Sequence, residues 1–261
     1  MGEGDPLVLI TGEFFDSRMW DDQIPLMAQE YKVLRYDLRG TGQSSHITTN
    51  YSHTNDLAAL LKFLNIKHAH VLGIMQGADI ALELALHYPE HVRSLIFAAA
   101  NFHGYVPPHF PNKGMSEVEN MLTNFFTENS NPDISQIGTR LIELNMSMPS
   151  FAPSPKHPDA RQRAETIMKE NIPQSFGFQL QGTSWDNPPA IHRLGDVHVP
   201  TLVIVGEHMP LDAHILADTV VKEIIGTNKV VIPDAPTLMN MDQPEAFNQV
   251  VLDFLQAVRD I

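Results

Sequence analysis

Short, almost continuous apolar runs alternate with stretches of helical periodicity along most of this chain. Apolar runs of this kind are typical of strands that are buried on both faces of a parallel sheet. The runs are Leu7–Thr11, Lys32–Tyr36, His70–Ile74, Leu95–Ala99, Thr201–Gly206 and Asn228–Pro233. Because helical segments separate them, the pattern predicts a doubly wound, mostly parallel α/β sheet with right-handed crossovers.

Two of the intervening segments show the periodicity of amphipathic helices. The first carries leucines at positions i, i+3, i+4 and i+7, from Leu57 to Leu64. The second lies near the end of the sequence, and Pro244 suits its first turn, where a missing N–H costs little. Its apolar stripe consists of Phe247, Val250, Val251, Phe254, Leu255 and Val258.

The alternation stops between residues 101 and 194, a region that combines proline-rich segments with further helical stretches. The stretches are Ser116–Glu128, Ile134–Met146, Ala160–Glu170 and Pro173–Gln181. A structureless excursion of this length is unusual inside a compact domain, so we interpret the region as an inserted helical cap. The expected organisation is a core of residues 1–100 and 195–261, with a cap of residues 101–194.

Composition narrows the classes of function. The 261 residues carry a formal net charge of −14, which disfavours nucleic acid and anionic membranes as partners. The chain has no cysteine, which excludes disulfides, thiolate catalysis and cysteine-ligated metals. We find neither a signal peptide nor an apolar run long enough to span a bilayer. We therefore expect a cytoplasmic protein that binds no nucleic acid and no membrane.

The heptapeptide GIMQGAD, residues 73–79, stands where a predicted strand turns into a helix. Glycines two positions before and after a central residue are typical of a sharp turn that displays a nucleophile, most often serine. The central residue here is Met75, and its thioether cannot attack a carbonyl carbon as a hydroxyl or a thiol can. The turn is therefore predicted without its usual chemistry.

Around this turn, the chain resembles the α/β-hydrolase family, particularly its capped esterase, enol-lactonase and C–C hydrolase branch. The resemblance covers nearly the whole chain and is weaker in the cap. It is carried by LVLITGEFFDSRMW, YKVLRYDLRGTGQSS, HVLGIMQGADIALELALHYPEHVRSLIFAAA, VPTLVIVGEHMPLDAH and IPDAPTLMNMDQPEAFNQVVLDFL, in that order. Together these segments imply the α/β-hydrolase fold, whereas a lone glycine motif would be a weak indication.

The resemblance also shows where this chain departs from the family. Hydrolysis in the family needs a serine, then an acid, then a histidine, because the imidazole activates the hydroxyl and the acid orients the imidazole. Aligning the flanking residues places Met75 at the nucleophile, Met209 at the acid and Thr237 at the histidine. All three triad positions are thus replaced, and we expect ordinary ester hydrolysis to be absent.

Some of the family's other catalytic groups are retained in the pattern. The amide of Gln76 and that of Glu13 or Phe14 fall at the places of the family's oxyanion hole, which can stabilise an enolate or a carbonyl oxygen without any nucleophile. Glu13 follows the turn at Thr11, where the family has histidine, and is our candidate acid or base. A solvent-exposed loop glutamate is the alternative interpretation.

The neighbours of these positions favour an apolar pocket that contacts a small carbonyl-containing molecule. The expected contact residues are Thr11, Phe15, Ile74, Asn101, His103, Met146, Phe176 and His208. In the alternative, Met75 and Met209 fill the vacated site as part of the core. The histidines form no H-E-x-x-H motif, so we expect no metal and no cofactor.

The first predicted strand begins within about seven residues of Met1, whereas family members usually have two antiparallel strands before it. Lys32–Tyr36 would then lie at the edge of the sheet. An open edge invites pairing with another chain, so we expect a homodimer there. A shortened sequence accounts for the same observation equally well.

Three functions remain in competition. The first is a non-hydrolytic enzyme, such as a lyase, cyclase, isomerase or decarboxylase, that acts on a small apolar carbonyl compound by orientation and an oxyanion hole. The second is a non-catalytic ligand-binding or regulatory pseudohydrolase, since a fold alone does not determine function. The third is a hydrolase with relocated catalytic groups. Of these, the sequence favours the first.

Overall fold

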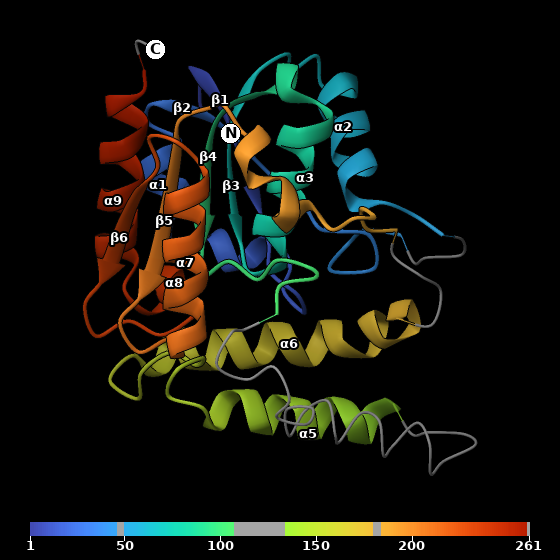
Figure 1. The fold of residues 1–261 in the computed structure, drawn as a ribbon. Coiled ribbons are helices and arrows are strands. Elements are labelled where there is room, and N and C mark those ends of the chain that lie inside the picture. The colour runs from blue at the N-terminus through green and yellow to red at the C-terminus, as the bar shows by residue number, and fades with distance from the viewer. Residues whose placement is uncertain (46–49, 107–133, 180–183, 260–261) are drawn as a thin grey trace.

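The computed structural model describes residues 1–45, 50–106, 134–179 and 184–259 (Figure 1). Its centre is a parallel sheet with the strand order β2-β1-β3-β4-β5-β6. The strands are β1 (Asp5–Ile10), β2 (Tyr31–Arg35), β3 (Ala69–Ile74), β4 (Val92–Ala98), β5 (Thr201–Gly206) and β6 (Asn228–Ile232). All six predicted strands are confirmed, and the central ones are buried on both faces, which explains their continuous apolar sequences.

Helices cover both faces of this sheet. α2 (His53–Phe63), α3 (Gln76–His87) and α7 (Leu211–Glu223) lie on one face, and α1 (Ile24–Met27) and α9 (Pro244–Ala257) lie on the other. The two helices predicted from apolar stripes are α2 and α9. Four short helical segments complete the core: η1 (Ser17–Trp20), η2 (Pro89–His91), η3 (Ala190–Asp196) and α8 (Met239–Asp242). The doubly wound architecture is therefore confirmed.

Two helices of the predicted cap, α5 (Ile134–Ser147) and α6 (Pro158–Gln179), pack against each other beyond the carboxyl ends of the strands (Figure 1). The prediction of separate helices over 160–170 and 173–181 is wrong, because α6 continues through Pro173. A proline removes one backbone hydrogen bond, and contacts with α5 can offset that loss. The predicted helix Ser116–Glu128 lies outside the described residues.

β2 forms one edge of the sheet, as the position of Lys32–Tyr36 in the sequence predicted. At Val33 this edge is already paired, because the Met1 amino group donates to Val33 O and Val33 N donates to Met1 O, both at 2.7 Å. Gly2 and Gly4, with φ of +79° and +112°, let the chain pass close to the backbone of β2. This pairing covers part of the surface on which the expected homodimer depends, and the homodimer stays a prediction.

Candidate functional site

The turn between β3 and α3 keeps the shape of a nucleophile elbow although its central residue is methionine. Met75 has φ 53° and ψ −122°, a conformation that costs a residue with a side chain of order 1–3 kcal/mol. A Cβ on Gly73 would lie 2.0 Å from Gly77 O, and a Cβ on Gly77 would lie 2.4 Å from Ile10 O. Both glycines are therefore required by close backbone approaches, and the turn is sterically fixed.

The Met75 side chain lies against the loop that follows β1. A Cβ built on Gly12 would be 2.8 Å from Met75 Sδ, so the thioether packs directly on the Gly12 backbone. Gln76 is the first residue of α3, and amides at this position have no acceptor within their own helix. The elbow thus combines an apolar thioether with a helix-start amide beside the Gly12 loop.

The loop itself holds four of the residues expected at the site. Phe15 is fully buried in the core, and Phe14 takes a positive φ of 66° next to the partly buried Glu13. Thr11 is also fully buried, and its hydroxyl has no hydrogen-bond partner among the described residues. This hydroxyl is a polar group that a ligand oxygen or a water could satisfy.

The segment after β4 approaches the elbow from the other side. Asn101 N donates to Met75 O at 3.4 Å, and the Asn101 side chain is exposed. His103, expected to contact a substrate, stacks its ring on that of Trp185, with the centroids 5.7 Å apart. Ile74, which precedes the elbow, is completely buried in the core. The structure therefore brings Asn101 to the elbow and places His103 where the chain re-enters the core.

Met209 and Thr237, the other two positions that the resemblance aligned with the triad, are engaged in local contacts. Met209 is 8% exposed, and its Sδ accepts a hydrogen bond from Gly206 N at 3.3 Å, within the turn after β5. Thr237 donates both its N–H and its hydroxyl to Ser150 O, at 2.8 and 2.9 Å. Ser150 belongs to the connection between α5 and α6, so Thr237 fastens the cap to the loop after β6.

Two buried acids on α3 were missed by the sequence analysis. Asp79 is 2% exposed, and burial raises its pKa to about 7, although His103 N donates to Asp79 Oδ2 at 2.9 Å. Asp79 Oδ1 has no partner among the described residues. One turn further, burial also raises the pKa of Glu83, which accepts from Thr54 Oγ1 and Asp186 N. Their i, i+4 spacing in an otherwise apolar helix was the available signal.

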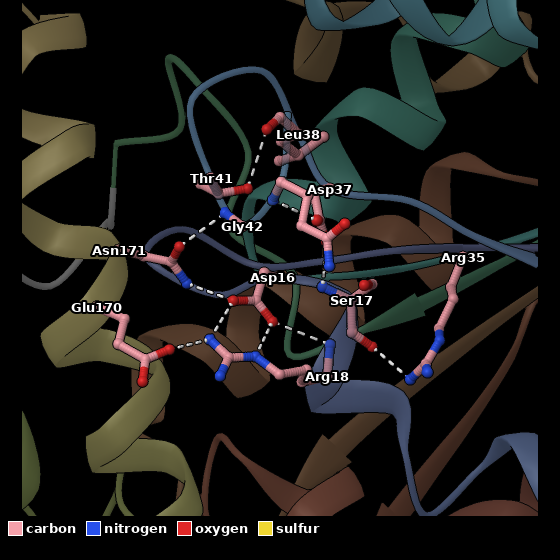
Figure 2. A network of polar contacts seen from close by, with 11 residues as sticks. Asp16, Ser17, Arg18, Arg35, Asp37, Leu38, Thr41, Gly42, Glu170 and Asn171 are labelled. Carbon is pink, nitrogen blue, oxygen red and sulfur yellow. Dashed lines mark hydrogen bonds and ion pairs between the residues drawn. The ribbon is translucent and has the colours of Figure 1, made fainter. Parts of the chain in front are cut away.

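A polar network connects α6 to the loop that follows β1 (Figure 2). Asp16 is 1% exposed and accepts hydrogen bonds from Arg18 and from Asn171 Nδ2, the latter at 2.8 Å. Burial opposes ionisation of Asp16, but these hydrogen bonds outweigh it and hold its pKa below the ordinary value. Asn171 Oδ1 accepts from Gly42 N at 2.8 Å, and Arg18 pairs with Glu170 at 2.6 Å.

The same network gives structural roles to Asp37 and Gly42, two residues of the segment YDLRGTGQSS. Asp37 Oδ1 accepts from Ser17 N and Asp37 Oδ2 accepts from Gln43 N, each at 2.8 Å. A Cβ on Gly42, which has a φ of +51°, would lie 2.2 Å from Asp37 Oδ2. The acid and the glycine of this motif therefore hold the loop that carries the cap contact.

Met146 and His208, two further expected contact residues, line a cleft of about 490 Å³ between the cap and the loops after β5 and β6. The Phe176 side chain lies outside the described part of the structure. Within the described ranges, no group of three or more histidine or acidic side chains is arranged to hold a metal ion. No described helix is long and apolar enough to cross a membrane.

Comparison with known proteins identifies the architecture. A family model described as the α/β hydrolase fold matches residues 5–244. The chain is 26% identical to 3-oxoadipate enol-lactonase 1 of Acinetobacter baylyi, over 98% of this chain and 91% of the relative.

Two solved structures have the same fold. A thermophilic esterase from Thermogutta terrifontis superposes with a TM-score of 0.79 at 24% identity, covering 99% of this chain and 92% of the esterase. A bromoperoxidase from Bacillus anthracis superposes with a TM-score of 0.77 at 22% identity, covering 98% of this chain and 93% of the bromoperoxidase.

Proposed function

The chain belongs to the α/β-hydrolase-fold family, and from this premise we propose that it lacks the family's Ser-Asp-His triad and works without hydrolysis. The proposed activity is that of a lyase, cyclase, isomerase or decarboxylase acting on a small, largely apolar carbonyl compound. The observation that carries this proposal is Met75 at φ 53°, in an elbow whose two flanking glycines are still sterically required.

The contacts at the three replaced positions argue against covalent acyl transfer. A nucleophile needs an adjacent base, and that base needs an orienting acid. Met75 and Met209 offer thioethers, which carry no acidic proton. The Thr237 hydroxyl donates to Ser150 O, so this interaction would have to break before its proton could serve a reaction. The simplest interpretation of these contacts is that the elbow keeps its shape and no longer forms a covalent acyl intermediate.

The remaining groups suit a reaction in which charge develops on a carbonyl oxygen. The Gln76 amide stands at the positive end of α3, and the Phe14 amide lies in the loop on which Met75 packs. Amides fixed in this way can stabilise an enolate-like transition state. Glu13, the residue after Gly12, is our candidate acid or base. The buried Thr11 hydroxyl offers a further polar contact.

The test combines identification of a ligand with a substitution at Glu13. Native mass spectrometry of the purified protein is expected to reveal a bound small molecule, which can then be supplied as substrate. Glu13→Gln should abolish product formation while ligand binding persists, and Glu3→Gln, a change at an exposed glutamate, should leave turnover intact. Unchanged turnover in Glu13→Gln would refute the role of Glu13. Binding without any turnover in the native protein would instead support the pseudohydrolase.

A further inference from the structure

The cleft that Met146 and His208 line also carries charged side chains that take no part in the elbow. Its outer wall is the connection between α5 and α6, residues 148–157, which we call the strap. Its inner wall is formed by the loops after β5 and β6 and by the end of α8. The charged, imidazole and apolar side chains that could contact a ligand there include those of Met146, Lys156, His157, Arg161, His208 and Asp242.

A buried carboxylate orients the imidazole of the strap. Asp242 is 2% exposed, and its Oδ1 accepts from His157 Nδ1 at 3.0 Å and from Ser154 N at 2.6 Å. Its Oδ2 is buried without a hydrogen-bond partner among the described residues. The His157 side chain is 46% exposed. Because Nδ1 is bound to Asp242, Nε2 is the ring nitrogen available to a ligand in the cleft.

Two permanent cations line the cleft without a carboxylate partner among the described residues. Arg161 donates to the backbone carbonyls of Pro153, at 3.0 Å, and of Met146. Lys156 is exposed and forms no ion pair within the described ranges. In a protein with a net charge of −14, unneutralised cations beside a cleft are the kind of group that a bound anion would satisfy.

Among the described residues, the acids that line the cleft do not form ion pairs with these two cations. His208, half exposed on the core side, lies 3.7 Å from Asp234 Oδ1, and the Asp234 side chain is 85% exposed and well hydrated. Asp242, the second acid, is covered by His157 and by the Ser154 amide. The two permanent cations, Lys156 and Arg161, therefore reach the cleft from its cap side, and the His208 imidazole faces them from the core side.

The walls of the cleft are apolar and stiff. Pro149, Pro153 and Pro155 on the strap and Pro236 on the core restrict the backbone on both sides. Met146 and Ala152 are buried and add an apolar floor. Thr237, next to Pro236, fixes the strap through Ser150, so the two walls are held together. A preformed cleft of this kind lowers the conformational entropy that the protein must lose when it binds a ligand.

We propose that this cleft is a binding site for a small organic acid with an apolar body. The carboxylate would accept hydrogen bonds from His157 Nε2 and from the Lys156 ammonium, and the body would lie against the prolines and Met146. Asp242 is a positioning residue, because it acts on the ligand only by orienting the His157 ring. The site is separate from the elbow, and its occupancy does not depend on the function proposed above.

Benzoate is a suitable probe, with benzamide as its neutral isostere. Titration with benzoate should saturate and shift the imidazole signals of His157 in ¹H–¹³C spectra, and calorimetry should give an affinity at least about tenfold above that for benzamide. Lys156→Gln and His157→Gln should each weaken benzoate binding about tenfold. The chain supplies a matched control, because Lys67 and His68 form the same exposed dipeptide elsewhere, and Lys67→Gln and His68→Gln should change nothing.

Asp242→Asn tests the positioning role. It should move the His157 ring signals in the unliganded protein and weaken benzoate binding, whereas a purely structural contribution would leave these signals in place. The proposal is overturned if benzoate fails to saturate the His157 shifts, or if benzamide binds equally well. It is also overturned if Lys156→Gln and His157→Gln bind benzoate as the native protein does, since the ligand would then occupy another site, such as that at Met75.

Discussion

Met75 has the backbone conformation of a nucleophile elbow and a side chain that cannot attack a carbonyl carbon. Its strained backbone is imposed by neighbours, because Gly73 and Gly77 allow approaches that no Cβ could tolerate. The glycine spacing is visible in the sequence, so this turn could be predicted. The packing of Met75 Sδ on Gly12 could not, since nothing in the local sequence specifies which backbone a flexible thioether will contact.

Substituting Gly77 tests whether the elbow is fixed by sterics. Gly77→Ala should lower the free energy of unfolding by about 2–3 kcal/mol, because its Cβ would lie 2.4 Å from Ile10 O. Gly195→Ala is the matched control, since no atom lies within 4 Å of the Cβ position there. Urea denaturation of both variants measures the difference. Equal stability of the two would show that the elbow relaxes easily.

Asp79 should make stability depend on pH. Its pKa is about 7 in the folded protein against an ordinary value of 3.8, so the folded state retains a proton that the unfolded state loses. Stability from this group is therefore fully present below pH 4 and is lost as the pH rises to 7. The loss approaches about 4 kcal/mol, at about 1.4 kcal/mol for each unit.

Asp79→Asn removes this ionisation and keeps an acceptor for His103 N. We expect the variant to be more stable than the native protein at pH 8 and the difference to shrink towards pH 4, as measured by urea denaturation across that range. Asp196→Asn, at an exposed aspartate, serves as the control. A constant difference across the range would contradict a raised Asp79 pKa.

At the scale of elements, strands and amphipathic helices followed from the sequence because each buries a regular apolar pattern. The continuity of α6 through Pro173 is not visible in the sequence, because packing against α5 can offset the hydrogen bond that a proline removes. The attachments of the cap were missed for another reason. Asn171 lies more than a hundred residues from Asp16 and Gly42, and no local pattern records contacts over such distances.

Asn171 should contribute strongly to the docking of α6. Asn171→Ala removes its hydrogen bonds to Gly42 N and Asp16 and leaves those buried groups short of a partner, so we expect a loss of about 2–3 kcal/mol in unfolding free energy. Hydrogen exchange along α6 should accelerate as well. Gln162→Ala, at an exposed amide of the same helix, should do neither. Unchanged exchange in Asn171→Ala would show that other contacts hold the helix.

At the scale of the whole molecule, the α/β-hydrolase fold carries the two packed helices α5 and α6 over the carboxyl ends of its strands, with a cleft between them and the core loops. Sequence was sufficient for the family and the fold, because ordered motifs span nearly the whole chain. It was not sufficient for the cleft, since His157 comes from the strap and Asp242 from α8, and only the packed cap brings them within 3.0 Å. Their pairing is a property of tertiary structure.

The most direct test of the central claim is the rate at which the protein hydrolyses p-nitrophenyl acetate. Without a nucleophile at Met75 or a base at Thr237, the native protein should release p-nitrophenol no faster than buffer does. Saturable release well above that rate, lost in Thr237→Ala or in His157→Gln, would contradict the account and show that the protein is a hydrolase with relocated catalytic groups.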